Sequence, residues 1–196
     1  LVYTGLPPKP EEMKAFLADE SDDAYRKAVD RLLASEAYGE RWGRRWLDLA
    51  RWAESDGHQH DEQRPDAWRY RDYVIRSVAE NKPYDQFVRE QLAGDEIELA
   101  SDETLIATGF LAAGRYSDNE LDKALQRNDI LVDITNATSS AVLGLTMHCA
   151  QCHTHKFDPV THTDYHAIAA VFSGVRHGER ALKPADYGER MAIPWL

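Results

Sequence analysis

The chain reads MHCAQCHTHKFDP over residues 147–159, and this stretch contains both of its cysteines and three of its eight histidines. Cys149 and Cys152 are separated by two residues, and His153 follows directly. This spacing is the attachment signature of c-type haem, in which two thiols form thioether bonds to the porphyrin and the adjacent histidine ligates the iron. The motif predicts one covalently bound haem c, with His153 as its proximal ligand.

The same residues allow other kinds of site. Cys149, Cys152 and either His153 or His155 could surround a structural zinc ion, although three of these ligands crowd one short turn. The two thiols could also form a redox dithiol or a disulfide. If haem is present, an open or displaceable sixth position would suit a haem enzyme, such as a peroxidase or an oxidoreductase acting on an organic substrate.

Composition limits the class of protein. The 196 residues are 43% apolar and carry a formal net charge of −11, which indicates one folded domain that is acidic overall. Nucleic acid is not an expected partner because phosphate binding needs a positive face, whereas an acidic surface suits a basic redox partner. No run of eighteen apolar residues occurs, so no transmembrane segment is expected. The chain begins with Leu1 rather than Met, and we expect it to be an excised part of a longer polypeptide.

Apolar residues recur at helical spacing along nearly the whole chain, and strand-like alternation is nowhere sustained. The predicted helices cover residues 11–18, 22–34, 38–53, 67–80, 84–93, 102–113, 121–147 and 161–172. The seventh is one long helix or two stacked ones, with the haem motif at its C-terminal end, and residues 179–196 are expected to wrap over the surface. The predicted fold class is all-α: residues 1–196 form a single multi-helix domain around a covalently attached haem, larger than a minimal cytochrome c, with little β structure.

Two other features have both a structural and a functional interpretation. Trp42 and Trp46 lie on the apolar face of the third predicted helix, and we favour packing in a core over a wall for haem. Residues 54–66 form a polar loop with five acids and with His58 and His60. We favour a solvated loop whose acids stabilise the start of the next helix, although its histidines could bind a cation or supply a haem ligand.

The sixth iron ligand must come from a distant part of the chain. His155 is excluded for the iron that His153 binds, because two residues span at most about 7 Å and axial ligands approach from opposite faces. His155 is better placed as a haem-propionate partner, a support for a ligand or a surface residue. His177 suits the sixth position because it lies just past Gly174, where the chain can reverse. The alternatives are no protein ligand or one of His58, His60, His162, His166 and Met191.

Several stretches together resemble one family. They read TGLPP (4–8), YGERW (38–42), WLDLAR (46–51), NKPYD (81–85), QLAGD (91–95), LGLT (143–146), CAQCHTHKFDP (149–159) and HGER (177–180). In this combination the chain resembles the planctomycete-specific cytochrome c-like domain of unknown function. That domain is the type found between a smaller cytochrome c-like domain and a second domain of unknown function in large envelope proteins.

The resemblance implies a covalent c-type haem, export to the periplasm or cell envelope, and electron transfer rather than catalysis by this domain alone. The partner would be a redox protein or a neighbouring cytochrome domain of the same polypeptide. The family pattern carries over to Cys149, Cys152 and His153 for attachment, and to His155 and Lys156 as part of the surroundings of the haem.

The C-terminal part of the same pattern bears on the second axial ligand. His177 falls in the matching HGER stretch, which strengthens its assignment as the distal ligand. His58 and His60 match no part of the pattern, so the resemblance implies no role for them.

Overall fold

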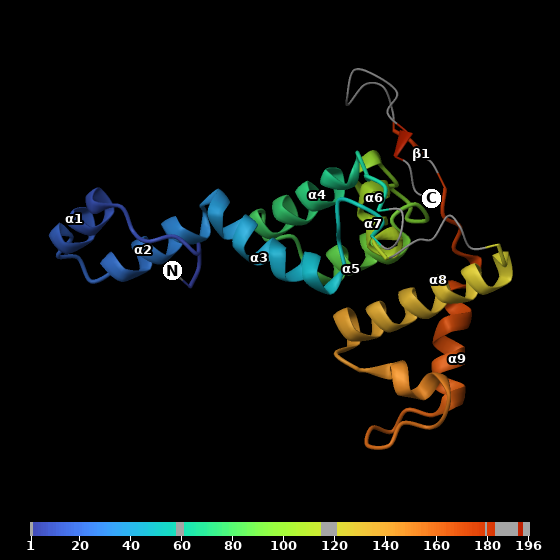
Figure 1. Ribbon diagram of the computed structural model, residues 1–196. Coiled ribbons are helices and arrows are strands. Elements are labelled where there is room, and N and C mark those ends of the chain that lie inside the picture. Colours follow the sequence, from blue (N-terminus) through green and yellow to red (C-terminus); the bar gives the residue numbers. More distant parts are fainter. Residues whose placement is uncertain (1, 58–60, 115–120, 179, 183–191, 194–196) are drawn as a thin grey trace.

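The computed structural model describes residues 2–57, 61–114, 121–178, 180–182 and 192–193. The described part is mostly helical, which confirms the predicted all-α class (Figure 1). The α-helices are α1 (Pro10–Ala18), α2 (Ala24–Leu33), α3 (Glu36–Leu49), α4 (Ala67–Ala79), α5 (Tyr84–Ala93), α6 (Asp102–Ala107), α7 (Gly109–Ala112), α8 (Lys123–Thr138) and α9 (His162–Val171). The shorter elements are the π-helix η1 (Ser139–Leu143), the 3₁₀ helices η2 (Met147–Gln151) and η3 (Phe172–Gly174), and the strands β1 (Arg180–Ala181) and β2 (Ala192–Ile193).

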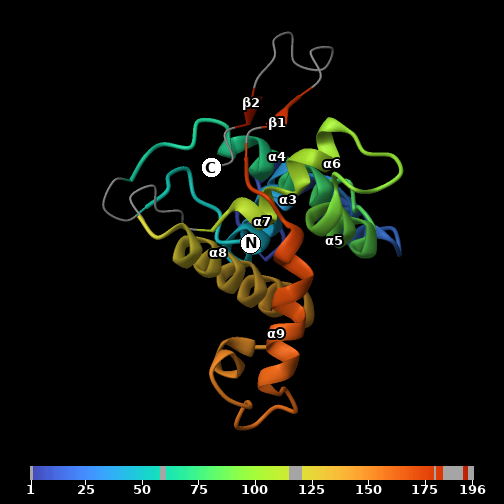
Figure 2. The same cartoon turned by 90° about the vertical axis from the view of Figure 1, so that its right-hand side faces the viewer.

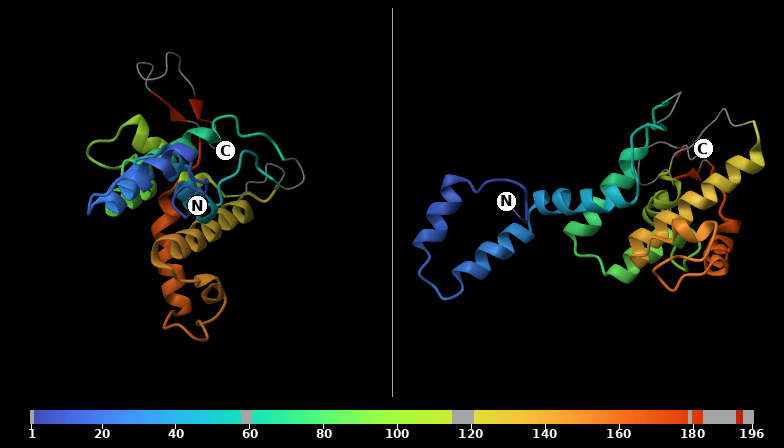
Figure 3. Two further views of the ribbon diagram at one scale, coloured as in Figure 1. Left: turned by 90° about the vertical axis from the view of Figure 1, so that its left-hand side faces the viewer. Right: turned by 60° about the horizontal axis from the view of Figure 1, so that its bottom comes forward.

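Helices α1 and α2 extend away from the rest of the molecule (Figures 1 and 3). Neither helix contains a buried residue. Their exposed apolar side chains include Met13, Leu17 and Tyr25. None of the helices in the described part of the chain is long and apolar enough to cross a membrane.

The body of the molecule is built on the pair α3 and α4, which make the most extensive contact between two elements. Glycine at positions 39 and 43 of α3 permits this close approach. A Cβ added at Gly39 would lie 2.9 Å from the carbonyl oxygen of Ile75, and one at Gly43 would lie 3.2 Å from the Ile75 side chain. Larger residues at these two positions would push α4 away.

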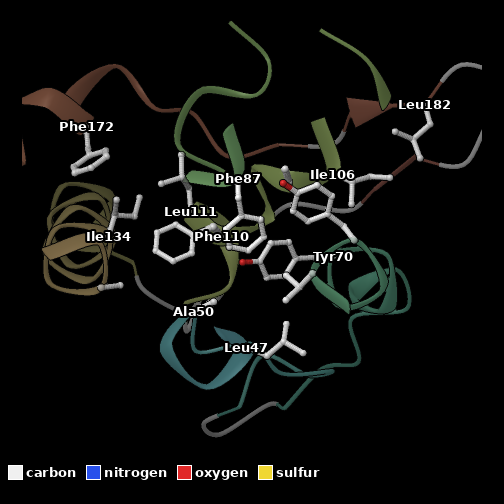
Figure 4. Packing of buried hydrophobic residues seen from close by; sticks show 14 residues of the cluster. Leu47, Ala50, Tyr70, Phe87, Ile106, Phe110, Leu111, Ile134, Phe172 and Leu182 are labelled. Carbon is white, nitrogen blue, oxygen red and sulfur yellow. The ribbon is translucent and has the colours of Figure 1, made fainter. Parts of the chain in front are cut away.

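The main core lies between α3–α8, η3 and the tail (Figure 4). Its buried members are Leu47, Ala50, Tyr70, Tyr73, Val74, Phe87, Ile106, Ala107, Phe110, Leu111, Ile134, Ala137, Phe172 and Leu182. Trp46 packs against this core, and its indole N–H donates to Gln91 Oε1 at 2.7 Å, while the Tyr70 hydroxyl donates to the same oxygen. The interpretation of Trp46 as a core residue is therefore confirmed.

A buried ion pair strengthens the same core. Lys82 Nζ lies 2.6 Å from Glu90 Oε2, which also accepts from the Tyr73 hydroxyl at 2.7 Å, and Gln86 donates to the other carboxylate oxygen. Burial alone would raise the pKa of Glu90, but the hydrogen bonds from Lys82, Gln86 and Tyr73 outweigh it and lower that pKa. The carboxylate is therefore held in its charged form.

A second, smaller core surrounds the Cys-x-x-Cys-His motif. It contains Met147 and Ala150 of η2 together with Val160 and Tyr165. Ile168 of α9 packs against both cores and so joins them. Figure 2 shows α9 running from the end of the molecule that holds this small core towards the main core.

The chain reaches the motif by a different route from the one predicted. The helical stretch that begins with α8 ends at η1, because Gly144 has φ +66° and its N–H and that of Leu145 both bond to the carbonyl of Ser139. A left-handed glycine of this kind is a common helix terminator. The motif therefore begins on the separate helix η2 and continues past its end at Gln151, and it does not lie at the C-terminal end of a helix spanning residues 121–147.

Three smaller predictions have mixed outcomes. The capping box of α9 is confirmed: Thr161 Oγ1 accepts from the Asp164 N–H at 3.1 Å, and Asp164 Oδ2 accepts from the Thr161 N–H at 2.8 Å. The helix predicted over residues 102–113 is divided into α6 and α7 at Thr108. The tail does more than cover the surface, because Leu182 is buried in the main core and β1 pairs antiparallel with β2.

Candidate functional site

Cys149 lies in η2, and Cys152 is the residue that ends it. A 3₁₀ helix has three residues per turn, so side chains three apart lie above one another. Met147 and Ala150 face inward onto α9, and Cys149 and Cys152 are exposed with free thiols.

The ring of His153 makes one hydrogen bond within the described part of the chain. Its Nδ1 lies 2.8 Å from the carbonyl oxygen of Thr154, and its side chain is exposed. A carbonyl oxygen only accepts hydrogen bonds, so Nδ1 carries the proton and the lone pair of Nε2 is left for a metal. Histidines that bind metals almost always donate their other ring N–H to a partner of this kind.

His155 has the opposite tautomer and a structural role. Its Nδ1 accepts from the backbone N–H groups of Phe157 at 3.3 Å and Asp158 at 2.9 Å, so its proton lies on Nε2. The Asp158 carboxylate, 3.4 Å from Nδ1, is then not a hydrogen-bond partner of that nitrogen. The backbone N–H of His155 donates to Val160 at 2.8 Å, which closes the loop. His155 therefore shapes the loop after the motif and has no free lone pair for iron, which agrees with its exclusion on chain reach.

Exposed apolar side chains flank the motif in the sequence. Leu143 and Leu145 precede it with exposed fractions of 53% and 36%, and Phe157 follows it at 84%. Lys156 Nζ lies 5.2 Å from the centroid of the Phe157 ring. These are exposed apolar and cationic side chains near the motif in the sequence.

The structure adds two residues that sequence reasoning missed. Tyr165 is buried in the small core, and its hydroxyl has no hydrogen-bond partner among the described residues. Burial, and to a smaller extent the nearby Cys152, raises the pKa of Tyr165. Asn136 of α8 donates its side-chain N–H to Nδ1 of His148 at 3.1 Å and so ties η2 to α8. Tyr165 could have been recognised from the sequence, because it lies one helical turn after the predicted N-cap Thr161. No sequence pattern marks Asn136.

His177 lies in a different part of the molecule from the motif. Its Nε2 donates to the carbonyl oxygen of Leu111 at 3.3 Å, and it lines a cavity of about 490 Å³ with Leu92, Leu105 and Val175. Burial lowers the pKa of His177 despite that hydrogen bond.

The structure thus does not bring His177 and the motif together, and its assignment as sixth ligand stays a prediction. Of the alternatives, His162 and His166 lie on α9, whose residues contact η2. His58, His60 and Met191 lie outside the described residues.

The donors in the motif are of types that both haem c and structural zinc use. Two free thiols and an adjacent imidazole with an available Nε2 are the donor set of a c-type haem. A structural zinc site needs four ligands around one point. In the part of the chain that the structure describes, no group of three or more His, Cys, Asp or Glu side chains could hold a metal ion.

Comparison with known proteins gives one family. The profile described as PSCyt2, protein of unknown function (DUF1549), matches residues 1–177, which include the motif, α9 and His177. No curated protein and no solved structure matches the chain.

Proposed function

Given that the chain belongs to the PSCyt2 family of proteins of unknown function, we propose that it is an electron-transfer domain that carries one covalently bound haem c. We further propose that it is of the planctomycete-specific cytochrome c-like type that its sequence resembles. The observation that carries the proposal is the 2.8 Å contact of His153 Nδ1 with the Thr154 carbonyl oxygen. A carbonyl oxygen only accepts, so this contact leaves Nε2 for iron, close in sequence to two exposed thiols.

Each residue of the site then has a defined task. Cys149 and Cys152 would hold the haem through thioether bonds, and His153 would ligate its iron. His155 keeps the following loop in shape through its two accepted N–H bonds. The haem supplies one-electron redox chemistry, and the protein sets its potential through the axial ligands, hydrogen bonds and burial.

The proposal extends to the place of work and the partner. Electron transfer by an exported protein would occur in the periplasm or cell envelope, with a redox protein or a neighbouring cytochrome domain of the same polypeptide. The net charge of −11 favours a basic docking partner, because opposite charges speed up encounter.

The test is a pyridine haemochrome spectrum of the chain produced with a secretion leader in cells that mature c-type cytochromes. We expect the spectrum of a haem with both vinyl groups saturated, and none from C149A/C152A. Purified chain without pigment, from cells that load a c-type cytochrome expressed alongside, would refute the proposal; bound zinc in that chain would favour the zinc module. A spectral change on adding cyanide or peroxide would point to an open iron site and hence to a haem enzyme.

A further inference from the structure

Two histidines of α9 converge on one point outside the haem motif. His162 and His166 are four residues apart, so they lie on the same face of the helix, one above the other. Their Nε2 atoms are 3.1 Å apart, their ring centroids are 4.4 Å apart and the ring planes are inclined by 66°. Both side chains are exposed.

This separation fits two ligands of one metal ion. Imidazole nitrogens bind such ions at about 2.0–2.1 Å, so two of them that are roughly 90–110° apart lie about 2.9–3.4 Å from each other. The pair also meets the criteria for a hydrogen bond, with the proton of one Nε2 shared with the other. On metal binding each ring would hold its proton on Nδ1, so that both Nε2 lone pairs face the ion.

The surrounding residues hold the pair in place. The capping box between Thr161 and Asp164 fixes the first turn of α9, where His162 lies. Tyr165 is buried against η2 and contacts the edge of the His166 ring, with centroids 5.3 Å apart. The positive end of the helix dipole disfavours a cation here, but the Asp164 carboxylate in the same turn offsets part of that charge. Because both rings are exposed, water can complete the coordination.

We propose that His162 and His166 form a surface site for a divalent first-row transition metal ion and are not alternatives for the sixth iron ligand. Neutral imidazole suits copper, nickel and zinc, and Cu²⁺ binds most tightly in the general affinity order. The described residues supply two protein ligands, so the site is open and exchangeable rather than a closed structural site. It does not rest on the haem proposal, since it uses neither Cys149 nor Cys152.

The test is Cu²⁺ binding to the full chain in the C149A/C152A background, which carries no thiols to compete. Titration calorimetry gives the affinity, and electron spin resonance shows how many nitrogens bind the copper. We expect one site with two nitrogen ligands. H162A and H166A should each weaken it at least about tenfold, because even indirect partners of metal ligands are worth about 10–100-fold in affinity.

Two variants control for other histidines and for folding. H148A removes an exposed histidine that is bonded to Asn136 rather than to a second imidazole, and it should leave the affinity unchanged. H166A/A167H keeps the number of histidines but moves one imidazole about 100° around the helix, at an exposed position, so it should lose the site. The proposal would be overturned if the parent bound no Cu²⁺. It would also be overturned if H162A, H166A and H166A/A167H bound Cu²⁺ as tightly as the parent. Helical circular dichroism equal to that of the parent confirms that each variant is folded.

Discussion

His155→Ala should loosen the loop after the haem motif without removing an iron ligand. The side chain is only 10% exposed, and its Nδ1 accepts from the N–H groups of Phe157 and Asp158. A neutral hydrogen bond contributes about 1 kcal/mol net, so the loss of two costs about 2 kcal/mol. That corresponds to roughly 30-fold in the opening equilibrium. Native-state hydrogen exchange should therefore be about 30-fold faster at these two amides.

Two substitutions separate an acceptor role from any other role of this histidine. In H155N the amide oxygen can take the place of Nδ1 and accept both bonds, so exchange should stay close to that of the parent. In H155Q the amide is displaced by one carbon towards the position of Nε2, so exchange should resemble that of H155A. Unchanged exchange in H155A, or equal acceleration in H155N and H155A, would refute the acceptor role.

The remaining predictions concern ligation, acid stability and backbone shape. H153A should keep covalent pigment but change its absorption spectrum through loss of the proximal ligand; an unchanged spectrum would exclude His153. H177A should convert the iron to five-coordinate or exchange its sixth ligand, and an unchanged spectrum would refute the assignment of His177. Burial lowers the pKa of His177 in the folded state, so as the pH falls below 6.5 the unfolded chain binds a proton at this residue before the folded chain does, and the folded state loses stability. In urea unfolding below pH 6.5, the free energy of unfolding of H177A should depend less on pH than that of the parent. An equal pH dependence would contradict this. K82M leaves the Glu90 carboxylate buried without its cation and should lower the free energy of unfolding by about 3 kcal/mol. The double variant K82M/E90Q should regain most of that free energy. A loss below about 1 kcal/mol in K82M would contradict a stabilising role for the ion pair. G144A has room for its methyl group, but the alanine must adopt φ +66°, so the free energy of unfolding should fall by about 1 kcal/mol. An unchanged free energy in urea unfolding would argue against the left-handed conformation at this position.

The parts of the fold that depend on local pattern could be predicted from the sequence. Helices α4, α5 and α9 have periodic apolar residues and clear ends, such as the capping box of Thr161 and Asp164, and they lie within two residues of the expected bounds. The predicted helix over residues 121–147 was too long. The small residues in this stretch are compatible with a continuous helix, so the sequence did not show where the helix ends. Only the left-handed conformation of Gly144 decides that the chain leaves the helix before the motif.

The sequence predicts those site residues whose role follows from their spacing along the chain. It does not predict those whose role depends on how the chain packs. Cys149, Cys152 and His153 follow from their spacing alone. The role of His155 depends on which backbone N–H groups the loop turns towards it, and a sequence does not contain that information. His177 was expected to be the sixth iron ligand; the structure shows its ring beside the Leu111 carbonyl oxygen, and the assignment stays a prediction.

Mass spectrometry of the denatured, matured chain tests the haem proposal most directly. Thioether bonds survive denaturation, so the intact mass should exceed that of the polypeptide by one haem, and the increase should disappear in C149A/C152A. A polypeptide mass without haem, from cells in which a control c-type cytochrome is fully loaded, would contradict the assignment of Cys149 and Cys152 as attachment sites.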